Sequence, residues 1–262
     1  MFYDDNFTAD RDFTRGLLNR LAGLGLRFNA QVRADFMWKG ADRRELDKPL
    51  LEAMQSAGGD VMYVGYETID DQTARRWHKG YGEGGSLRDR LAQDTRIFHD
   101  HGLWVHGMFV LGPEHGDRDA RNIVDFARAT RIESLQVSVL TPLPGTPTYD
   151  QMKPHLVLNR YPEDWDYYDG THCVYNHGRL GIEGLTRALL TLHRRFYGWR
   201  GASLRRMLVS LRQEGTLREN LKMMYRHFQI GRQTLKAWHE ETQGFIQLVR
   251  DRLARRAPQL GG

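Results

Sequence analysis

The sequence predicts an α/β protein built from parallel strands, followed by a helical C-terminal region. Two observations lead to this prediction. Short apolar strands alternate with amphipathic helices through roughly the first half of the chain, and this alternation is typical of parallel βαβ units. Towards the C-terminus, apolar residues recur every three or four positions, which is the period of a helix that packs along one face.

Composition limits the class of protein. A chain of 262 residues, 40% of them hydrophobic, can bury one substantial core. No apolar run approaches the roughly 20 residues that a membrane-spanning helix needs, and the start lacks a basic segment followed by an apolar stretch. These features favour a cytoplasmic location. The single cysteine, Cys173, excludes an internal disulfide framework and any iron–sulfur or zinc site built from several cysteines of these residues.

The net charge of +5 is unevenly distributed. Residues 1–178 carry 21 Lys and Arg against 27 Asp and Glu, whereas residues 179–262 carry 17 against 6. The C-terminal region is therefore strongly basic, and it could contact nucleic acid or an anionic membrane surface. Because its arginines are spread through amphipathic helices, we expect a solvated and internally docked helical face, which makes a nucleic-acid partner the less favoured interpretation.

Strands and helices are expected in strict alternation. Paired glycines after the second helix suit a helix C-terminus. The expected strands are 1–7, 26–36, 61–68, 103–112 and 134–140, and the expected helices are 13–24, 47–59, 86–102 and 118–131. About five strands are too few to close an eight-stranded barrel, so they predict an open sheet.

The pattern changes after Leu140. The stretch TPLPGTPTYDQM contains three prolines and one glycine, which predict a rigid loop without regular structure, and an irregular segment is expected to continue to about Asn176. Two stretches with apolar residues at helical spacing follow, and the second is interrupted at Gly231 and Thr242. At this spacing both apolar faces are expected to be packing surfaces. Their apolar residues are Leu185, Leu189, Leu192 and Phe196, then Leu217, Leu221, Met224, Phe228, Leu235, Trp238, Phe245 and Val249.

Polar residues follow or end every predicted strand. In parallel α/β proteins, ligands bind at the carboxyl ends of the strands. Acids, an arginine and amides that converge there can hold a zwitterionic ligand through charge-assisted hydrogen bonds, although each residue alone could equally be a cap or a surface turn. In strand order, these residues are Asp4, Asp5 and Asn6; Gln31, Arg33 and Asp35; Glu67 and Thr68; His106, Gly107 and Met108; and Thr141 and Pro142.

A collinear series of motifs resembles a known family. In order, the motifs are FYDDNFT, QVRADF, GYETIDDQTARRWHKGY, GMFVLGPEHGD, TPLPGTPTYDQM and DWDYYDGTHCVY, and they cover roughly residues 1–178. The series is similar to the second and later strands of radical S-adenosylmethionine enzymes. The resemblance is strongest to their cobalamin-binding class, which includes the anaerobic magnesium-protoporphyrin ester cyclase, related methyltransferases and hopanoid-pathway proteins.

The resemblance implies a partial (β/α) barrel without its first strand at 1–150, an irregular substrate-facing connection at 151–178 and a basic helical region at 179–262. In this family, a CxxxCxxC loop after the first strand holds a [4Fe-4S] cluster, and a cobalamin domain precedes it. Neither is found in these residues. The resemblance therefore implies that a missing N-terminal half, in the same chain or a partner chain, supplies the cluster loop and the cobalamin domain.

The resemblance also implies residue roles in binding S-adenosylmethionine. Asp4, Asp5 and Asn6 would meet its amino group, Arg33 and Glu67 would point into the barrel near its sulfonium and ribose, and Lys79 would pair with its carboxylate. Gly107, Met108 and Phe109 would border the adenine, and Thr141, Pro142 and Leu143 would form the rim after the last strand. From the residues alone, Lys79 could equally be a surface lysine, and Met108 and Phe109 plain core.

The chemistry implied by the family is radical. A reduced cluster would cleave S-adenosylmethionine to a 5′-deoxyadenosyl radical, which takes a hydrogen atom from the substrate, and a methyl transfer or an oxidative ring formation can follow. The substrate would be a small molecule, a lipid or a tetrapyrrole. Within the aromatic and acidic run 161–177, Tyr167, Tyr168 and His172 are candidate substrate contacts, whereas Trp165 is expected to pack the barrel onto the C-terminal helices.

Two other classes remain as alternatives. A metal-dependent barrel hydrolase could use Asp4, Asp5, Glu67 and His106 as strand-end ligands. A non-catalytic module could bind nucleic acid or lipid through its basic helices, and the same helices allow peripheral membrane contact. Neither alternative explains the ordered series of motifs, so the radical enzyme is the preferred interpretation.

Overall fold

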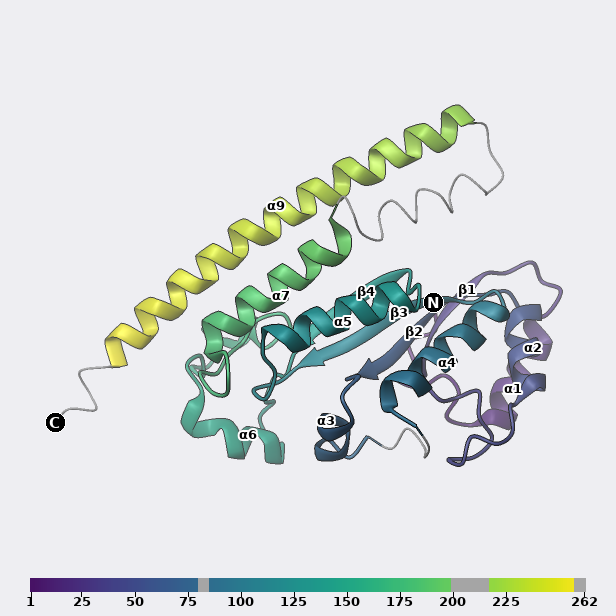
Figure 1. The fold of residues 1–262 in the computed structure, drawn as a ribbon, viewed down its shortest axis with the longest axis horizontal. Coiled ribbons are helices and arrows are strands. Elements are labelled where there is room, and N and C mark those ends of the chain that lie inside the picture. The colour runs from purple at the N-terminus through teal and green to yellow at the C-terminus, as the bar shows by residue number, and fades with distance from the viewer. Residues whose placement is uncertain (80–84, 199–216, 257–262) are drawn as a thin grey trace. The chain divides into compact units, whose positions relative to one another are not determined.

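A computed structural model describes residues 1–79, 85–198 and 217–256 (Figure 1). Within the last helix, side chains are described for residue 233 and residues 236–255. The helices are α1 (Arg11–Leu21), α2 (Lys48–Ser56), α3 (Asp71–Arg76), α4 (Leu87–Asp100), α5 (Asp117–Ala129), α6 (Pro147–Met152), α7 (Gly181–Tyr197) and α9 (Leu217–Arg256). The strands are β1 (Phe28–Arg33), β2 (Gly59–Glu67), β3 (Trp104–Leu111) and β4 (Ser134–Val139), and the 3₁₀ turns are η1 (Lys153–His155) and η2 (Trp165–Tyr167).

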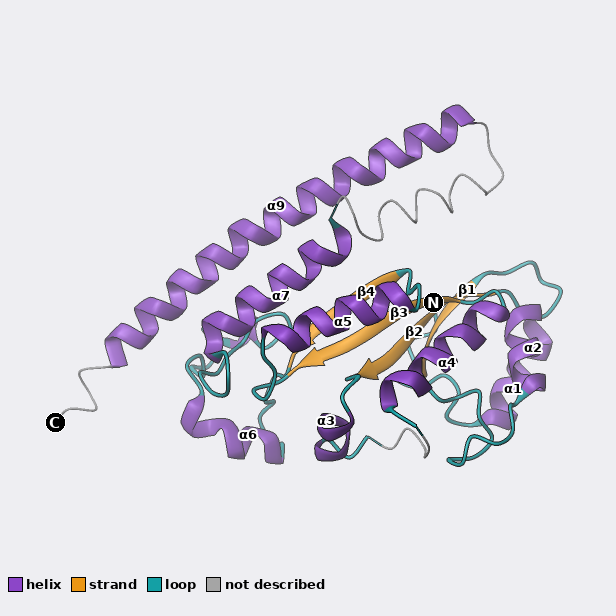
Figure 2. Cartoon of the chain, in the orientation of Figure 1, coloured by secondary structure: helices purple, strands orange, loops and turns teal. Residues whose placement is uncertain are grey.

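The four strands form one sheet in the order β1-β2-β3-β4 (Figure 2). The β1–β2 and β2–β3 pairs are both parallel, and helices separate all four strands along the chain. The predicted α/β class with parallel strands is therefore confirmed. The finer prediction of an incomplete barrel is a proposal that the sheet alone does not decide.

The expected strand at 1–7 is wrong. Residues 1–4 have no regular structure, and residues 5–8 form a turn. Two backbone bonds still place this segment beside β1, because the amides of Phe2 and Phe7 donate to the carbonyls of Asn29 and Gln31, each at 2.9 Å. These acceptors are two residues apart on β1 while the donors are five apart, so the segment cannot keep the even spacing of a parallel ladder.

The protein consists of two compact units. The first unit comprises residues 1–109 and 125–136, and the second comprises residues 110–124 and 137–262. The division does not follow the sequence-predicted boundaries at 150 and 178, which stay predictions. None of the helices among the described residues is both long and apolar enough to cross a membrane.

Alternate residues of the strands form the core of the first unit. Ala30, Val32, Met62 and Val64 are at most 2% exposed, and their neighbours along each strand are less buried. This period of two is the expected consequence of the pleat. Aromatic residues extend the core towards α4 and α5: the Tyr66 hydroxyl bonds to Thr95 Oγ1 at 2.6 Å, and its ring meets Phe126 edge-on at 5.9 Å.

Helices start where short polar side chains can cap them. Asp10 accepts from the amides of Asp12 and Phe13 at the start of α1, and Asp47 accepts from the Leu50 amide at the start of α2. Asp70 and Ser86 cap α3 and α4 in the same way. The short α3 was not predicted, because its six residues contain one apolar residue, Ala74, and so carry no apolar period.

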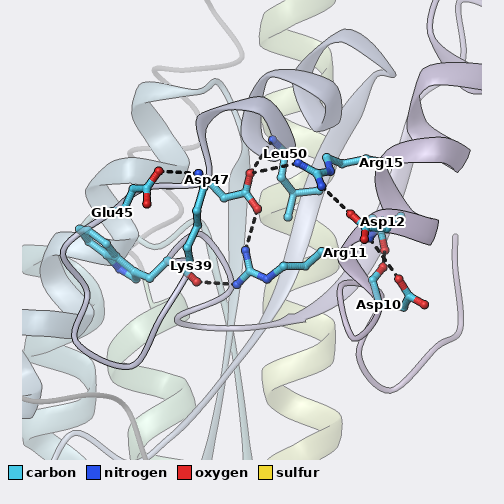
Figure 3. Close-up of polar contacts among 10 residues, drawn as sticks. Asp10, Arg11, Asp12, Arg15, Lys39, Glu45, Asp47 and Leu50 are labelled. Atoms are coloured by element: carbon cyan, nitrogen blue, oxygen red, sulfur yellow. Dashed lines mark hydrogen bonds and ion pairs between the residues drawn. The ribbon is translucent and has the colours of Figure 1, made fainter.

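An arginine–aspartate group fastens α1 to the start of α2 (Figure 3). Arg11 Nη1 donates to Asp47 Oδ2 at 2.8 Å, and Arg15 Nη1 lies 4.0 Å from the other oxygen of the same carboxylate. Asp47 is 3% exposed, so its charge depends on these partners and on the α2 amide that it caps. The loop that leads from β1 to α2 is thereby tied back to α1.

In the second unit, the proline-rich stretch after β4 differs from its prediction. The proline-rich stretch after β4 was expected to lack regular structure, yet Pro147 opens α6 and the Thr146 hydroxyl caps it by accepting from the Tyr149 amide at 3.2 Å. A proline is well tolerated at the first position of a helix, because its missing amide would have no intrahelical acceptor there. Only residues 141–146 of the stretch remain irregular or turn.

Helices α7 and α9 meet along the predicted stripes. Leu185, Leu192 and Phe196 of α7 are at most 1% exposed, and Phe245 and Val249 of α9 are at most 5% exposed. Trp238 is 36% exposed but meets His193 edge-on at 4.4 Å. Helix α9 runs unbroken through both expected interruptions, Gly231 and Thr242. The side chains of Leu217, Leu221, Met224, Phe228 and Leu235 lie outside the described residues.

Candidate functional site

One face of the sheet in the first unit carries most of its polar strand residues, although Val61 and Trp104 also lie on it. Its side chains alternate with the core residues of each strand and are half-buried or exposed. We call this set the polar face, and its members are Asn29, Gln31 and Arg33 on β1; Tyr63, Gly65 and Glu67 on β2; His106 and Met108 on β3; and Ser134 on β4. Because the strands are parallel, the ends of β1 and β2 lie on the same edge of this face.

A bulge at the end of β2 sets the direction of Glu67. Gly65 is opposite Met108, but Glu67 is opposite Phe109, so Tyr66 is an extra residue in the ladder. Glu67 has a φ of 60°, and the Thr68 amide closes a tight turn onto the Tyr66 carbonyl at 2.6 Å. Bulges re-aim side chains next to active sites. Left-handed backbone in a residue that is not glycine is strained and clusters at functional sites.

The re-aimed carboxylate lies over Gly65. A Cβ built on Gly65 would stand 3.1 Å from Glu67 Oε1 and within 4 Å of no other atom. Lys79 Nζ approaches the same carboxylate oxygen at 3.8 Å, and both side chains are partly exposed. The missing side chain at Gly65 therefore admits the Glu67 carboxylate at the point where it meets an ammonium, and a strand glycine often marks close approach by a ligand or another backbone.

Arg33 borders the same space from β1. Its Cα is paired with that of Gly65, and Gly65 is paired in turn with Met108. The guanidinium binds Asp35 through two hydrogen bonds, Nε to Oδ1 at 2.9 Å and Nη2 to Oδ2 at 3.0 Å. This bidentate contact orients Arg33, whose side chain stays 53% exposed. Arg33 and Met108 thus flank Gly65 on the neighbouring strands, Glu67 lies over it and Lys79 lies beside Glu67, while their predicted roles in binding a ligand stay predictions.

The two neighbours of Met108 point away from the polar face. Phe109 is 1% exposed and stacks on Tyr66 at 5.2 Å on the core side of the sheet. A Cβ at Gly107 would meet Phe109, Ile132 and Tyr66 at 3.1–3.3 Å, so this glycine makes room for the core aromatics. Gly107 and the Phe109 side chain therefore serve packing, and of these three residues only Met108 lies on the polar face.

The N-terminal acids are not held in place by side-chain partners in the described residues. Asp4 and Asp5 are exposed. Asn6 is half-buried, and its Oδ1 accepts from the amide and the hydroxyl of Thr8 at 3.3 and 3.1 Å, which is a local Asx turn. Their predicted contact with an amino group stays a prediction.

The predicted rim after the last strand belongs to the second unit. The Thr141 hydroxyl donates to the Val139 carbonyl at 3.1 Å, and Pro142 is buried. Leu143 is 50% exposed, and its carbonyl accepts from the amide and the hydroxyl of Thr146. These residues form a turn that supports α6.

Two of the predicted substrate contacts pack against α9. His172 lies 4.6 Å from Phe245, and Tyr167 lies 5.3 Å from the same ring. His172 Nδ1 contacts Asp169 Oδ2 at 2.9 Å, while its Nε2 lies 3.7 Å from Glu241 Oε1 on α9. The helix-packing role that was expected of Trp165 therefore falls to Tyr167 and His172.

Trp165 and Tyr168 lie together on the surface side of the same segment. Trp165 is 45% exposed and stacks on Tyr168 at 5.8 Å. The Tyr168 hydroxyl donates to the Leu158 carbonyl at 2.8 Å, and partial burial raises the pKa of Tyr168 to about 12. This tyrosine is a neutral hydrogen-bonding group and offers no base at neutral pH.

Three side chains on neighbouring strands lie side by side across the middle of the polar face, and this arrangement was not predicted from the sequence. Gln31 is paired with Tyr63, and Tyr63 with His106. The rings of Tyr63 and His106 lie 4.5 Å apart, and His106 Nδ1 contacts Ser134 Oγ at 2.7 Å. The period of two in each strand was the available signal, but the register between strands is needed to join these residues.

The described residues contain no group of three or more His, Cys, Asp or Glu side chains placed to hold a metal ion. The strand-end ligands of the hydrolase alternative therefore find no support in the described part of the chain. Cys173 is completely buried, and burial raises the pKa of its thiol to about 12. A neutral buried thiol is a poor metal ligand.

Comparison with known proteins identifies methyltransferases. The chain is 29% identical over 198 residues to bacteriochlorophyllide d C-12(1)-methyltransferase of Chlorobaculum tepidum. The aligned residues make up 75% of the chain and 40% of the relative. It is 27% identical over 159 residues to hopanoid C-2 methylase of Rhodopseudomonas palustris. Here the aligned residues make up 58% of the chain and 28% of the relative. The chain thus spans well under half the length of these relatives. No protein-family model matches it.

Solved structures with partial similarity include the radical S-adenosylmethionine methyltransferase TsrM from Kitasatospora setae, with a TM-score of 0.46 and 16% identity over 57% of the chain and 28% of TsrM. Another is the cobalamin-dependent S-adenosylmethionine radical enzyme OxsB, with a TM-score of 0.37 and 18% identity over 58% of the chain and 21% of OxsB. The sequence relatives are named as methyltransferases and a methylase, so the chain is related to enzymes and the relatives agree with the family resemblance.

Proposed function

We propose that the chain forms the S-adenosylmethionine-binding part of a radical methyltransferase. The observation that supports this most directly is the meeting of Arg33, Glu67 and Lys79 around Gly65. A guanidinium, a carboxylate and an ammonium near a strand position without a side chain suit a ligand that carries both charges. The relatives are methyltransferases, which favours methyl transfer over ring formation as the outcome.

Each residue then has a binding role in this proposal. Lys79 pairs with the methionine carboxylate as a point charge, and Glu67 accepts from a ribose hydroxyl or faces the sulfonium. Arg33, held by Asp35, stands near the same part of the ligand, and Met108 supplies an apolar wall beside Gly65. Asp4, Asp5 and Asn6 are proposed for the amino group, and Thr141, Pro142 and Leu143 for the rim.

The cofactors implied by the family fit these residues unequally. The charged and polar side chains of the polar face support the proposed binding of S-adenosylmethionine. A [4Fe-4S] cluster does not fit, because its three thiolate ligands cannot come from one buried cysteine. We propose that cluster and cobalamin are held by residues outside these 262, as parts of the same enzyme, and that the substrate is a lipid, a tetrapyrrole or another small molecule.

Binding of S-adenosylmethionine to the chain tests the proposal. We expect calorimetry to detect binding by the wild type, and Glu67→Gln or Lys79→Gln to weaken it by about tenfold, because each removes a charge-assisted contact. The matched control is the exposed Lys39–Glu45 ion pair of the same unit. Lys39→Gln and Glu45→Gln should leave the affinity unchanged. Equal losses in both pairs, or no binding by the wild type, would contradict the proposal.

A further inference from the structure

Three aromatic rings gather on the surface of the second unit, and none of them has a role in the proposed binding of S-adenosylmethionine. Tyr161 is 77% exposed and Trp165 is 45% exposed. Trp165 meets Tyr161 at 5.4 Å with an interplanar angle of 88°, and it stacks on Tyr168 at 5.8 Å with an angle of 23°. We call Tyr161, Trp165 and Tyr168 the aromatic patch. A group of exposed rings indicates binding more strongly than a single exposed apolar residue does.

A buried carboxylate fixes the backbone that carries the aromatic patch. Asp164 belongs to the same segment, and its side chain is 1% exposed. It accepts from the amides of Asn159 and Arg160 at 3.0 and 2.8 Å, and from Arg252 Nη2 at 2.9 Å. The Tyr168 hydroxyl is also held, since it donates to a backbone carbonyl at 2.8 Å. The rings are therefore preorganised, which reduces the entropy that a ligand loses in ordering them.

The segment that carries the aromatic patch is acidic. Residues 160–169 contain one arginine and four acids. Asp164 and Asp169 are engaged by an arginine and a histidine, whereas Glu163 and Asp166 are exposed and form no ion pair with a described residue. Both lie within two positions of Trp165 in the sequence, so their Cα atoms are within about 8 Å of its own, inside the range over which charges act at physiological salt. The surface here repels anions and attracts cations.

Ring faces and negative charge together favour a cation as the ligand. The faces of tryptophan and tyrosine attract a cation that lies within about 6 Å of the ring centroid. Because Tyr161 and Trp165 meet at nearly a right angle, a small group placed in the corner between them lies over both rings. A neutral apolar group would gain the contact with the rings but nothing from the carboxylates.

The size and exposure of the aromatic patch narrow the class of cation. Its rings come from residues 161–168 alone, and neighbouring centroids are under 6 Å apart, which is far smaller than the about 800 Å² that each partner contributes to a stable protein interface. A primary ammonium is strongly hydrated, and rings that remain partly exposed replace its water poorly. A quaternary ammonium shields its charge with methyl groups and is the cation that aromatic rings commonly bind.

We propose that the aromatic patch binds the quaternary ammonium group of a small molecule. Tyr161 and Trp165 contact its methyl groups, Tyr168 supports Trp165 by stacking, and Glu163 and Asp166 supply the negative potential. The inference does not rest on the proposed function, because the polar face belongs to the first unit and the aromatic patch to the second.

Titration of choline into the whole chain tests the inference. In proton NMR, the N-methyl signal should move upfield because the methyl protons lie over ring faces, and the shift should saturate with a dissociation constant of about 10 mM or tighter. The matched probe is 3,3-dimethyl-1-butanol, in which carbon replaces the charged nitrogen at nearly the same shape. It should bind at least about fivefold more weakly.

Variants of the aromatic patch locate the binding. Trp165→Leu should weaken choline binding by at least about fivefold and remove most of the upfield shift, whereas Trp165→Phe keeps a ring face and should retain part of both. Glu163→Gln combined with Asp166→Asn should weaken binding by about threefold, and the loss should shrink as salt is added. Circular dichroism checks the fold of each variant.

Matched controls come from the first unit. Tyr3 is 87% exposed, so Tyr3→Leu removes an exposed ring elsewhere. Glu52 and Asp100 are also exposed, and Glu52→Gln combined with Asp100→Asn removes the same two charges. Both controls should leave the affinity for choline unchanged.

Four results would overturn the inference. The first is no saturable shift with the wild type, and the second is equal affinity for choline and its neutral analogue, which would indicate apolar contact only. The third is an equal loss of affinity in the controls. The fourth is binding to phosphatidylcholine vesicles that depends on Trp165 without binding of free choline, because the occupant would then be a membrane surface.

Discussion

Individual buried charges of this protein depend on their partners. Asp94, on α4, is completely buried and receives Trp38 Nε1 at 2.8 Å and Arg43 Nη1 at 2.9 Å. Burial raises the pKa of Asp94, and the hydrogen bonds from Arg43 and Trp38 oppose that rise. Arg43 adopts a φ of 55° in reaching this carboxylate, and its guanidinium lies 4.8 Å above the Trp38 ring. The loop before α2 is thus fixed to α4 by one ionic contact.

Neighbouring arginines allow a matched test of that contact. Arg43→Met leaves the Asp94 carboxylate buried with a single strong donor, so we expect the free energy of unfolding to fall by about 3 kcal/mol or more. Arg44→Met is the control, because the Arg44 side chain is 86% exposed and should cost less than about 0.5 kcal/mol. Urea denaturation followed by circular dichroism measures both. Equal effects of the two substitutions would contradict the interpretation.

The buried thiol gives a second prediction at this scale. Cys173 is completely buried, its Sγ donates to the Tyr175 carbonyl at 3.2 Å, and burial raises its pKa to about 12. Because the thiolate is the reactive form, a thiol reagent such as dithionitrobenzoate should not label the folded chain at pH 8. Labelling should reach one group per chain after unfolding in guanidinium. Rapid labelling of the folded chain would show that Cys173 is accessible.

Among the elements, α9 is held to its own unit by two ion pairs of different character. Arg250 binds Glu183 of α7 through two hydrogen bonds at 2.9 and 2.8 Å, and the two side chains are 53% and 31% exposed. Arg252 donates to Asp164 at 2.9 Å, and the Asp164 side chain is 1% exposed. Asp164 also accepts from the amides of Asn159 and Arg160. The second pair therefore fixes a buried charge and an irregular segment together.

Substitution of these two arginines should give unequal effects. Arg252→Met leaves the buried Asp164 charge without its cation, and we expect a loss of about 2–3 kcal/mol in unfolding free energy. Arg250→Met should cost under about 1 kcal/mol, because water replaces the contact of Glu183. The two variants control for each other, since each replaces one arginine of α9 by methionine. A larger loss in Arg250→Met would refute this ranking.

The contact between α7 and α9 should also depend on pH. His193 is 4% exposed on α7, its Nδ1 contacts the Leu189 carbonyl at 3.0 Å, and burial lowers its pKa to about 4. The folded state thus resists protonation that the unfolded state accepts near pH 6.5. The stability that neutral His193 provides is complete above about pH 6.5 and is lost as the pH falls towards 4, up to about 3 kcal/mol.

Urea unfolding at pH 7.0 and at pH 4.5 measures this dependence. The drop in unfolding free energy between the two values should be smaller by about 2–3 kcal/mol in His193→Gln than in the wild type. The exposed His177 provides the control, and His177→Gln should keep the pH dependence of the wild type. If His193→Gln and the wild type respond alike, then His193 is not the buried titrating group.

At the level of elements, local patterns predicted most strands and helices, whereas contacts between distant residues did not follow from them. β1, β3, α2 and α4 lie where apolar periodicity and caps place them. Residues 1–7 do not form a strand because their backbone bonds to β1 are unevenly spaced. That spacing depends on a contact between distant parts of the chain, which a local pattern does not report. The sequence pattern indicated that Arg33 and Glu67 lie near the ends of strands. It did not indicate the bulge that turns Glu67 over Gly65, because the bulge depends on the register between β2 and β3.

Across the whole molecule, the chemistry proposed for this chain needs a group that the chain cannot hold. A [4Fe-4S] cluster requires several thiolates, and these 262 residues contain one cysteine. That cysteine is buried and protonated at neutral pH. The relatives are also far longer than the matched part, since the chain covers 40% of one and 28% of another. We therefore expect the metal chemistry and the binding of cofactor and substrate to separate experimentally.

Anaerobic reconstitution of the chain with iron and sulfide tests this separation. After desalting, we expect far less than one cluster per chain by iron analysis and by absorbance, and no cleavage of S-adenosylmethionine under dithionite. Cys173→Ser should carry the same residual iron as the wild type, because a single buried thiol contributes no stable cluster ligand. A stoichiometric cluster that disappears in Cys173→Ser would mean that chains assemble around a shared centre, and the division of labour proposed for the enzyme would then be wrong.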